Sequence, residues 1–272
     1  MRLPAAETLA LSVESDVLHL TLNRPGRKNA MNGQMLDELT DVLRAVDGKT
    51  RAVVLRGAGG TFCAGADIKD MASGSGANPA ATPEQRHVAT ARGNRRFGTV
   101  SSLTDALSQP VVGVVEGAAM GGGFGLVCVT DIALCHRDAK FGLPETGLGI
   151  VPAQIAPFVV ERIGLTQARR LALTGARFDG VEAQRLGIVH EVYDDTAALD
   201  AALSDVLKRI RRCAPAANLA TKRLIKRVGA RDLEPILDEA AEVFATASLG
   251  DEGREGMLAF VEKRLPGWAT ED

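Results

Sequence analysis

The chain has few aromatic side chains, little net charge and no long apolar run. Aromatic residues make up 4% of its 272 residues, and Trp268 is the single tryptophan. This composition argues against a surface on which the bases of single-stranded nucleic acid could stack. The formal net charge of −2 gives no basic footprint for nucleic acid or for an anionic membrane. We therefore expect neither of these among its partners.

Cysteine and histidine are also scarce, and their spacing fits no metal or nucleophile pattern. The cysteines indicate neither a zinc site nor a disulfide framework, so we expect reduced, buried thiols at Cys63, Cys128, Cys135 and Cys213. No serine lies in a GxSxG turn. No apolar run could cross a bilayer, and no basic N-terminal segment leads into an apolar stretch. We expect a soluble, cytoplasmic protein without a bound metal.

Apolar periodicity predicts strands that alternate with helices in the first part of the chain. Residues 17–22 alternate between apolar and polar side chains, whereas residues 52–55 and 111–115 are short apolar runs typical of buried strands. Between the first two segments, Asn32 is a candidate helix cap. The apolar residues that follow it at helical spacing are Leu36, Leu39, Leu43 and Val46. We expect an α/β core over residues 1–195.

Helical spacing of apolar residues dominates the rest of the chain. The two stripes consist of Leu199, Leu203, Val206 and Ile210, and of Leu233, Ile236, Leu237, Ala240 and Phe244. They predict a C-terminal helical region over residues 196–272.

A loop rich in glycine, serine, alanine and proline is predicted at residues 72–83, which read ASGSGANPAATP. This loop closely follows the AGAD turn at residues 64–67. Two roles are consistent with this composition: the loop covers a bound ligand, or it only connects two elements at the surface.

Two glycine-containing turns follow predicted strands. One contains Gly121, Gly122 and Gly123, and the other lies in the segment TFCAGADIKD at residues 61–70, just after the strand at 52–55. Glycines let the backbone turn tightly and leave amide groups uncovered near a helix start, where negative charge is favoured. Two backbone donors from separate segments are typical of an oxyanion site. The alternative for the glycine triplet is a purely structural close approach.

Five segments together resemble the enoyl-CoA hydratase/isomerase, or crotonase, family. They are LTLNRPGRKNAMN (20–32), FCAGADIKDM (62–71), VEGAAMGGGFGL (115–126), FGLPETGLG (141–149) and RLALTGARFDGVEAQRLGIVHEV (170–192). The resemblance implies a crotonase-like spiral of ββα units and a homotrimer or a dimer of trimers in which the C-terminal helices make subunit contacts. It also implies an acyl-CoA substrate, with coenzyme A as part of the substrate and no separate cofactor.

The resemblance also implies roles for particular residues. It places the two oxyanion donors at the backbone N–H groups of Ala66 and Gly122, and the proton-transferring carboxylate at Glu145. A polarised thioester exchanges protons at its α-carbon more readily, so a nearby carboxyl group can act as acid or base. Burial would raise the pKa of that group. The alternative for Glu145 is an ordinary glutamate at a helix start.

Contacts to CoA are expected near the same turns. Arg24 is the first choice among the basic residues of LNRPGRKN, and solvated surface charge is the alternative for Arg27 and Lys28. The resemblance adds further binding residues, so that the expected set is Arg24, Lys28, Ala64, Asp67, Ile68 and Gly121. For Asp67, capping of the following helix is an alternative. Asp131 is expected to hold a turn.

Gly125 departs from the pattern of two-glutamate hydratases, which carry their second carboxylate at this position. The sequence around residues 121–134 and 148–164 is similar to hydratases of methylglutaconyl-CoA or isohexenylglutaconyl-CoA. It therefore predicts an enoyl-CoA hydratase, a lyase that adds water to a branched 2-enoyl-CoA with one glutamate. The alternatives are a Δ3,Δ2-enoyl-CoA isomerase and a non-catalytic acyl-CoA-binding homologue.

Overall fold

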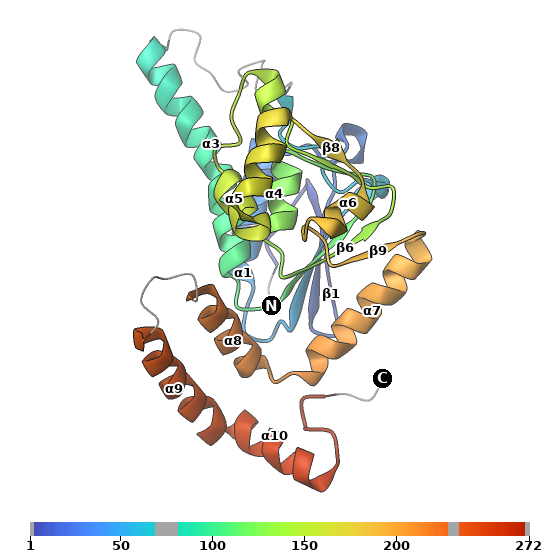
Figure 1. Cartoon of the computed structure of the whole chain (residues 1–272), viewed down its shortest axis with the longest axis vertical. Helices are drawn as coiled ribbons and strands as arrows, with labels where there is room; N and C mark the ends of the chain where they lie inside the picture. Colours follow the sequence, from blue (N-terminus) through green and yellow to red (C-terminus); the bar gives the residue numbers. More distant parts are fainter. Residues whose placement is uncertain (1–2, 69–80, 228–233, 270–272) are drawn as a thin grey trace. The chain divides into compact units, whose positions relative to one another are not determined.

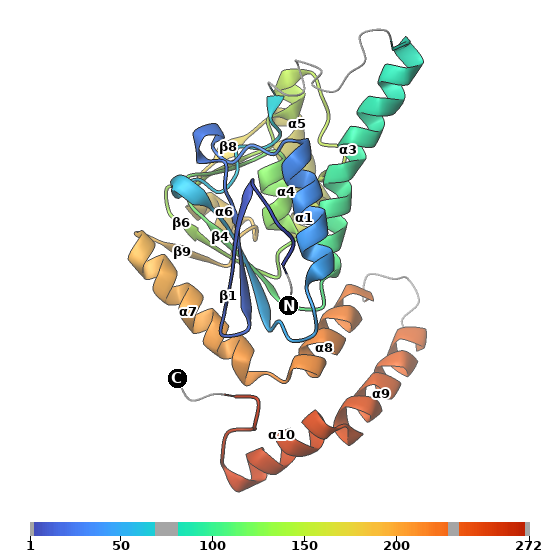
Figure 2. The same ribbon diagram turned by 180° about the vertical axis from the view of Figure 1, so that it is seen from behind.

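The computed structural model describes residues 3–68, 81–227 and 234–269 and divides the chain into two compact units. The first unit comprises Met1–Leu107 and Val111–Leu203, and the second comprises Ser108–Pro110 and Ser204–Asp272. Figures 1 and 2 show the chain from opposite sides. The strands belong to the first unit, and the last three helices belong to the second.

A six-stranded sheet forms the centre of the first unit. Its order is β1 (Leu9–Glu14), β2 (Val17–Leu22), β3 (Ala52–Gly57), β4 (Val111–Val115), β6 (Ile132–His136) and β9 (Glu191–Tyr193). β1 pairs antiparallel with β2 through a two-residue turn, and the remaining neighbours are parallel. All five residues of β4 are buried, as expected for a parallel sheet that is covered on both faces. The alternating segment of the sequence thus corresponds to β2, and the two apolar runs correspond to β3 and β4.

A three-stranded sheet contains parts of the segments 115–126, 141–149 and 170–192. It consists of β5 (Ala118–Met120), β7 (Lys140–Gly142) and β8 (Arg177–Phe178). Phe124 meets Phe141 and Phe178 edge to face, with ring centroids 6.4 and 6.2 Å apart. Aromatic pairs in this geometry stabilise a core beyond their buried area.

Helices α1 (Gly33–Ala45), α3 (Pro83–Ala106) and α4 (Gly122–Cys128) cover the large sheet at β2–β4, where their side chains meet those of the strands around an apolar pocket. Figure 2 shows α1 and α3 side by side. The predicted cap is confirmed, because the Asn32 side chain accepts a hydrogen bond from the Met35 N–H at 3.0 Å. The buried face of α1 consists of Met35, Leu39, Val42 and Leu43, while Leu36 and Val46 pack against the core from its margin.

Further helices complete the first unit. They are α5 (Ala156–Thr174), α6 (Gly180–Arg185) and the start of α7 (Thr196–Arg212), together with the 3-10 turns η1 (Pro25–Arg27), η2 (Ala58–Gly60) and η3 (Glu145–Leu148). Leu199, Leu203 and Ile210 of the predicted apolar stripe are buried. Because α7 runs across both units, the predicted division into residues 1–195 and 196–272 stays a prediction.

The second unit is helical, with α8 (Pro215–Arg227), α9 (Glu234–Leu249) and α10 (Asp251–Glu262). The Ala216 N–H donates to Glu252 at 2.9 Å, and the Trp268 indole N–H donates to the Arg212 carbonyl at 3.2 Å. Ile236 is buried, yet Phe244 is exposed. The α/β core and the C-terminal helices that the sequence predicts are therefore confirmed.

One expectation from the sequence falls largely outside the described residues, and another is contradicted by the structure. Residues 72–80 of the predicted loop lie outside the described residues, and Pro83 begins α3. Three cysteines are buried as expected, but the expectation was wrong for Cys213, which is exposed near the end of α7. Among the helices of the described residues, none combines the length and the apolar character needed to span a membrane.

The packing of α5 predicts a clear contrast between two leucines on this helix. Leu171 is fully buried, whereas Leu173 is 72% exposed. We expect Leu171→Ala to lower the free energy of unfolding by about 2–5 kcal/mol, because it leaves a cavity. Leu173→Ala is the matched control and should change it by less than about 0.5 kcal/mol. Urea denaturation of both variants measures this, and equal losses would contradict the burial of Leu171.

Candidate active site

The segment that contains the first predicted donor, Ala66, is held along one edge by β5. The Cys63 N–H donates to the Ala118 carbonyl at 2.8 Å, and the Met120 N–H donates to the Cys63 carbonyl at 3.0 Å. These two bonds form an isolated parallel bridge between Cys63 and Ala119. The segment therefore enters the site as an extension of the small sheet.

The residue Met31 holds the same segment along its other edge. The Met31 N–H donates to the Gly65 carbonyl at 2.8 Å, and the Asp67 N–H donates to the Met31 carbonyl at 2.9 Å. These two bonds form a second isolated parallel bridge. It pairs Met31 with Ala66, although the hydrogen-bonding groups on that segment belong to Gly65 and Asp67. In such a parallel pairing, the N–H of Ala66 points away from Met31.

Glycines bring this segment against the start of α4. A β-carbon at Gly65 would lie 2.9 Å from the Met120 carbonyl oxygen and 3.8 Å from the Gly122 nitrogen. A β-carbon at Gly123 would lie 2.7 Å from that of Cys63. Since real β-carbons do not approach other atoms so closely, both positions require glycine. The structure thus places the two predicted turns side by side.

Gly122 is the first residue of α4, and Gly121 is its N-cap. The N–H groups in the first turn of a helix have no partner within that helix. Gly121 has a φ of +50°, in the region that favours glycine, and its own N–H donates to the Gly142 carbonyl at 2.9 Å. This bond orients the turn, so that Gly122 can present its amide beside the Gly65–Ala66 peptide.

Glu145 reaches the same turn from η3. A β-carbon at Gly121 would lie 2.8 Å from the Glu145 Oε1 atom, so the carboxyl group occupies the space that glycine leaves. The turn η3 is anchored to α5 by the Thr146 hydroxyl, which donates to the Ala172 carbonyl at 2.8 Å. The sequence could assign Glu145 to this place only by resemblance, because it lies 23 positions after Gly122 along the chain.

The Glu145 carboxyl group has an uncompensated oxygen. Its Oε2 atom is buried and has no hydrogen-bond partner among the residues that the structure describes. Burial raises the pKa of Glu145 above its ordinary value, because the charged form loses solvation. A half-buried carboxyl group with a raised pKa beside the Gly121 turn is suited to proton transfer.

Apolar side chains fill the space beside Gly125. A β-carbon there would lie 2.8 Å from the Ile155 β-carbon and 3.5 Å from the Phe97 ring. Ile155 is buried and precedes α5, while Phe97 belongs to α3. The sequence analysis did not identify these two residues, because nothing in their local pattern indicates contact with Gly125.

The predicted CoA-binding residues lie at several places around the first donor segment. Arg24 contacts Asp67 at 3.1 Å, so the structure brings these two together. Lys28 has an exposed side chain and a left-handed φ of +49°, and its carbonyl accepts a hydrogen bond from the Ala64 N–H at 2.9 Å. Ile68 is 46% exposed. Capping of a helix by Asp67 would involve residues outside the described part of the chain.

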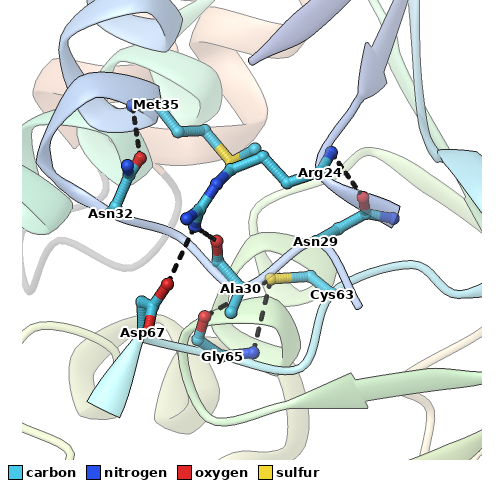
Figure 3. A network of polar contacts seen from close by, with 8 residues as sticks. All are labelled: Arg24, Asn29, Ala30, Asn32, Met35, Cys63, Gly65 and Asp67. Carbon is cyan, nitrogen blue, oxygen red and sulfur yellow. Dashed lines mark hydrogen bonds and ion pairs between the residues drawn. The ribbon is translucent and has the colours of Figure 1, made fainter. Parts of the chain in front are cut away.

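The buried residue Asn29 was missed by the sequence analysis. Its side-chain oxygen accepts a hydrogen bond from the Arg24 N–H at 2.9 Å, and its amide donates to the carbonyls of Ala58 and Thr61 at 2.9 and 2.6 Å. Figure 3 shows its contact with Arg24. In the sequence, Asn29 lies between Lys28 and Ala30, and an asparagine in such a stretch does not by itself indicate a structural role.

Asp131 has the structural role expected, since its side chain accepts a hydrogen bond from the Val111 N–H at 2.7 Å.

Comparison with known proteins gives a consistent result. A family model described as enoyl-CoA hydratase/isomerase matches residues 12–271. The solved structure of Pseudomonas aeruginosa AtuE is 55% identical, with a TM-score of 0.92, and the match covers 97% of this chain and 100% of that chain.

Relatives with different reactions are similar to nearly the whole chain. The peroxisomal Delta(3,5)-Delta(2,4)-dienoyl-CoA isomerase of Arabidopsis thaliana is 30% identical over 97% of this chain and 96% of its own length. The 2,3-dehydroadipyl-CoA hydratase of Escherichia coli is also 30% identical, over 95% of this chain and 97% of its own length.

The contact between Gly125 and Ile155 makes position 125 sensitive to any side chain. We expect Gly125→Ala to lower the free energy of unfolding by about 1–3 kcal/mol, because the added methyl group overpacks the site. Gly147→Ala is the matched control, since a β-carbon there would have no atom within 4 Å. Thermal or urea unfolding measures both. If Gly125→Ala left the free energy of unfolding unchanged, Ile155 would be able to move away from position 125 without loss of stability, and the prediction would be wrong.

The raised pKa of Glu145 predicts how stability depends on pH. The stability associated with the neutral carboxyl group is full below its unfolded value, near 4.5, and is lost as the pH rises through the raised pKa. We expect Glu145→Gln to become more stable relative to the parent as the pH rises. Urea unfolding between about pH 4 and about pH 8 tests the sign.

Glu182→Gln is a control with the opposite sign. A hydrogen bond from Arg185 lowers the pKa of Glu182, so its stabilising contribution is present above the unfolded value and is lost as the pH falls. If Glu145→Gln followed the same trend as Glu182→Gln, burial would not be the dominant influence on Glu145.

Proposed function

This chain belongs to the enoyl-CoA hydratase/isomerase family, and we propose that it is a hydratase that adds water to a 2-enoyl-CoA with one glutamate, Glu145. The observation that carries the proposal is that the buried Glu145 oxygen beside the turn formed by Gly121 and Gly122 has no hydrogen-bond partner within the described part of the chain. A carboxyl group in this condition has capacity to hold a water molecule and to exchange a proton with it.

The proposed oxyanion site consists of the backbone N–H groups of Ala66 and Gly122. A thioester carbonyl oxygen placed between them would carry the negative charge that develops during the reaction. Donors that are fixed in advance stabilise such charge without reorganising, which is where their catalytic effect arises. The bridges to β5 and Met31 support this role, because they hold the first donor segment along both edges.

One carboxylate can carry out both proton transfers of the hydration. Glu145 takes a proton from water while the water oxygen bonds to C3 of the enoyl thioester, and the double-bond electrons move to the thioester as an enolate. Glu145 then gives the same proton to C2, and the carbonyl reforms. The substrate gains one hydroxyl group and one hydrogen on the same face, and Glu145 returns to its starting state.

The surroundings of Gly125 support a mechanism with one glutamate. The position that carries a second carboxylate in two-glutamate hydratases is closed in this chain by Ile155 and Phe97. An apolar wall there would leave water activation to Glu145.

The proposed substrate is a branched 2-enoyl-CoA of the glutaconyl type, which carries a second carboxylate at the far end of its acyl chain. The similarity of residues 121–134 and 148–164 to glutaconyl-type hydratases supports it. The related 2,3-dehydroadipyl-CoA hydratase also acts on the thioester of a dicarboxylic acid. Lys28, with its exposed side chain, is the proposed contact for the CoA phosphates.

A Δ3,Δ2-enoyl-CoA isomerase is the second candidate. A single carboxyl group suffices to move a proton between two carbons, and the similar dienoyl-CoA isomerase shows that the family includes this class of reaction. The two candidates differ in one product property, because hydration adds the mass of one water and isomerisation adds none.

A cytoplasmic homotrimer or dimer of trimers remains our expectation for the assembly. Support comes from the second unit, in which large apolar side chains of α9 and α10 are exposed: Leu237, Phe244, Leu249, Met257, Leu258, Phe260 and Val261. Contiguous exposed apolar side chains are typical of surfaces that bind another protein.

Replacement of the carboxyl group tests the function. We expect Glu145→Gln to lower the rate of hydration by roughly 100- to 10,000-fold, because the amide cannot take up the proton. The rate is followed by mass spectrometry of the product with methylglutaconyl-, isohexenylglutaconyl-, crotonyl- and 3-enoyl-CoA. Glu161→Gln, on the exposed side of α5, is the control and should retain the parent rate.

Each other outcome has a distinct meaning. Unchanged hydration by Glu145→Gln would overturn the assignment of Glu145. Products of unchanged mass would identify an isomerase, and tight binding without turnover would identify a non-catalytic acyl-CoA-binding protein.

A further inference from the structure

We propose that Arg24 and Asp67 form a pair of positioning residues that fixes the direction of the Ala66 N–H, the first donor of the oxyanion site. This inference rests on the proposed function, because it concerns how that donor is aimed. It also gives Arg24 a different task from the one that its sequence motif suggests, which is contact with a CoA phosphate.

The Arg24 guanidinium faces the donor segment. Its Nη1 atom lies 3.1 Å from Asp67 Oδ2 and also donates to the Ala30 carbonyl. The side chains of Arg24 and Asp67 are 17% and 6% exposed. Figure 3 shows the guanidinium between Ala30 and Asp67. A guanidinium that is engaged and mostly covered in this way is poorly placed to present its charge to a phosphate in solvent.

The peptide between Gly65 and Ala66 is fixed from its N-terminal side. A peptide bond is planar and trans, so the direction of the Gly65 carbonyl determines the opposite direction of the Ala66 N–H. The Met31 N–H holds that carbonyl at 2.8 Å. The Gly65 N–H donates to the Cys63 Sγ atom at 3.4 Å (Figure 3), which restrains the preceding peptide as well.

The C-terminal side of Ala66 depends on Asp67. Its N–H donates to the Met31 carbonyl at 2.9 Å, and its carboxylate is held by Arg24. Without the ion pair, the chain after Ala66 would lose a side-chain contact that adds to the backbone bond with Met31. Rotation about the bonds on either side of Ala66 would then tilt its N–H.

Arg24 can act as a fixed point because Asn29 anchors it. Asn29 is fully buried with a left-handed φ of +54°, and it accepts the Arg24 N–H at 2.9 Å. The Asn29 amide donates to the carbonyls of Ala58 and Thr61, which lie between β3 and the donor segment. The hydrogen bonds of Asn29 and Arg24 therefore connect the backbone after β3 with Asp67.

The two roles of Arg24 predict different kinetics. Loss of a phosphate contact weakens binding of substrate and transition state equally and raises KM, whereas a misdirected oxyanion donor lowers kcat. A displacement of about 1 Å at a reacting group costs on the order of 100-fold in rate. We expect Asp67→Asn and Arg24→Met each to lower kcat by roughly 10- to 100-fold, with KM changed by less than about threefold.

A double-mutant cycle tests whether the two residues act as a pair. The variant with both Arg24→Met and Asp67→Asn should lose no more activity than either single variant, because both changes remove the same interaction. Multiplied losses would overturn the pairing. Arg24→Lys keeps the charge and should recover part of kcat. Lys28→Met is the comparison for a CoA contact and should raise KM instead.

A spectroscopic measurement distinguishes misdirection of the donor from general damage. Glu145→Gln serves as a background with strongly reduced turnover, and cinnamoyl-CoA serves as the probe, since its conjugated thioester absorbs at longer wavelength when the carbonyl is polarised. We expect binding to shift the absorption of this probe to the red, and we expect Asp67→Asn in the same background to reduce that shift. Circular dichroism and thermal unfolding of each variant control for loss of the fold.

The outcomes separate this inference from the proposed function. A red shift that Asp67→Asn and Arg24→Met leave unchanged, or an increase in KM with kcat unchanged, would overturn the positioning role and leave the oxyanion site intact. Absence of any red shift in the Glu145→Gln background would instead contradict the oxyanion site itself.

Discussion

The approach of one stretch of backbone to another, without an intervening side chain, is the constraint on which the candidate site depends. Gly65 lies against the Met120 carbonyl and Gly123 lies against Cys63, at distances that leave no space for a β-carbon. These two contacts bring the end of the first donor segment and the start of α4 together. Any larger residue would separate the two amides that we propose as a pair.

The carboxyl group occupies the remaining space at this junction. The Glu145 carboxyl group lies next to Gly121, where the absence of a β-carbon leaves space for it. Its buried Oε2 atom has no hydrogen-bond partner among the described residues. Burial without a partner weakens a fold. Such a feature persists where a reaction needs an uncommitted group, and this agrees with the raised pKa of Glu145. Ile155 and Phe97 close the space at Gly125, which supports our proposal that Glu145 acts as the one carboxyl group.

The polar network behind the site has a complementary role. Asn29 accepts a hydrogen bond from the Arg24 N–H and donates to two backbone carbonyls, and the Arg24 guanidinium contacts Asp67 and the Ala30 carbonyl. In the proposed mechanism, the residues that would hold the donor gain from being hydrogen-bonded, whereas the carboxyl group that would exchange protons gains from being free to bond. The structure therefore contains two kinds of covered polar group: side chains engaged in hydrogen bonds, and the Glu145 Oε2 atom, which has no hydrogen-bond partner among the described residues.

Local patterns in the sequence determined the strands β2, β3 and β4, the Asn32 cap of α1, the C-terminal helices and the two glycine turns, because each depends on neighbouring residues. Glu145 and the donors Ala66 and Gly122 could be named only by resemblance, and their roles stay proposals. The tertiary structure decided which segments meet. Ile155 closes the space at Gly125, and Arg24 turns inward to Asp67. Contacts between residues so far apart in the chain arise from packing, which no local spacing encodes.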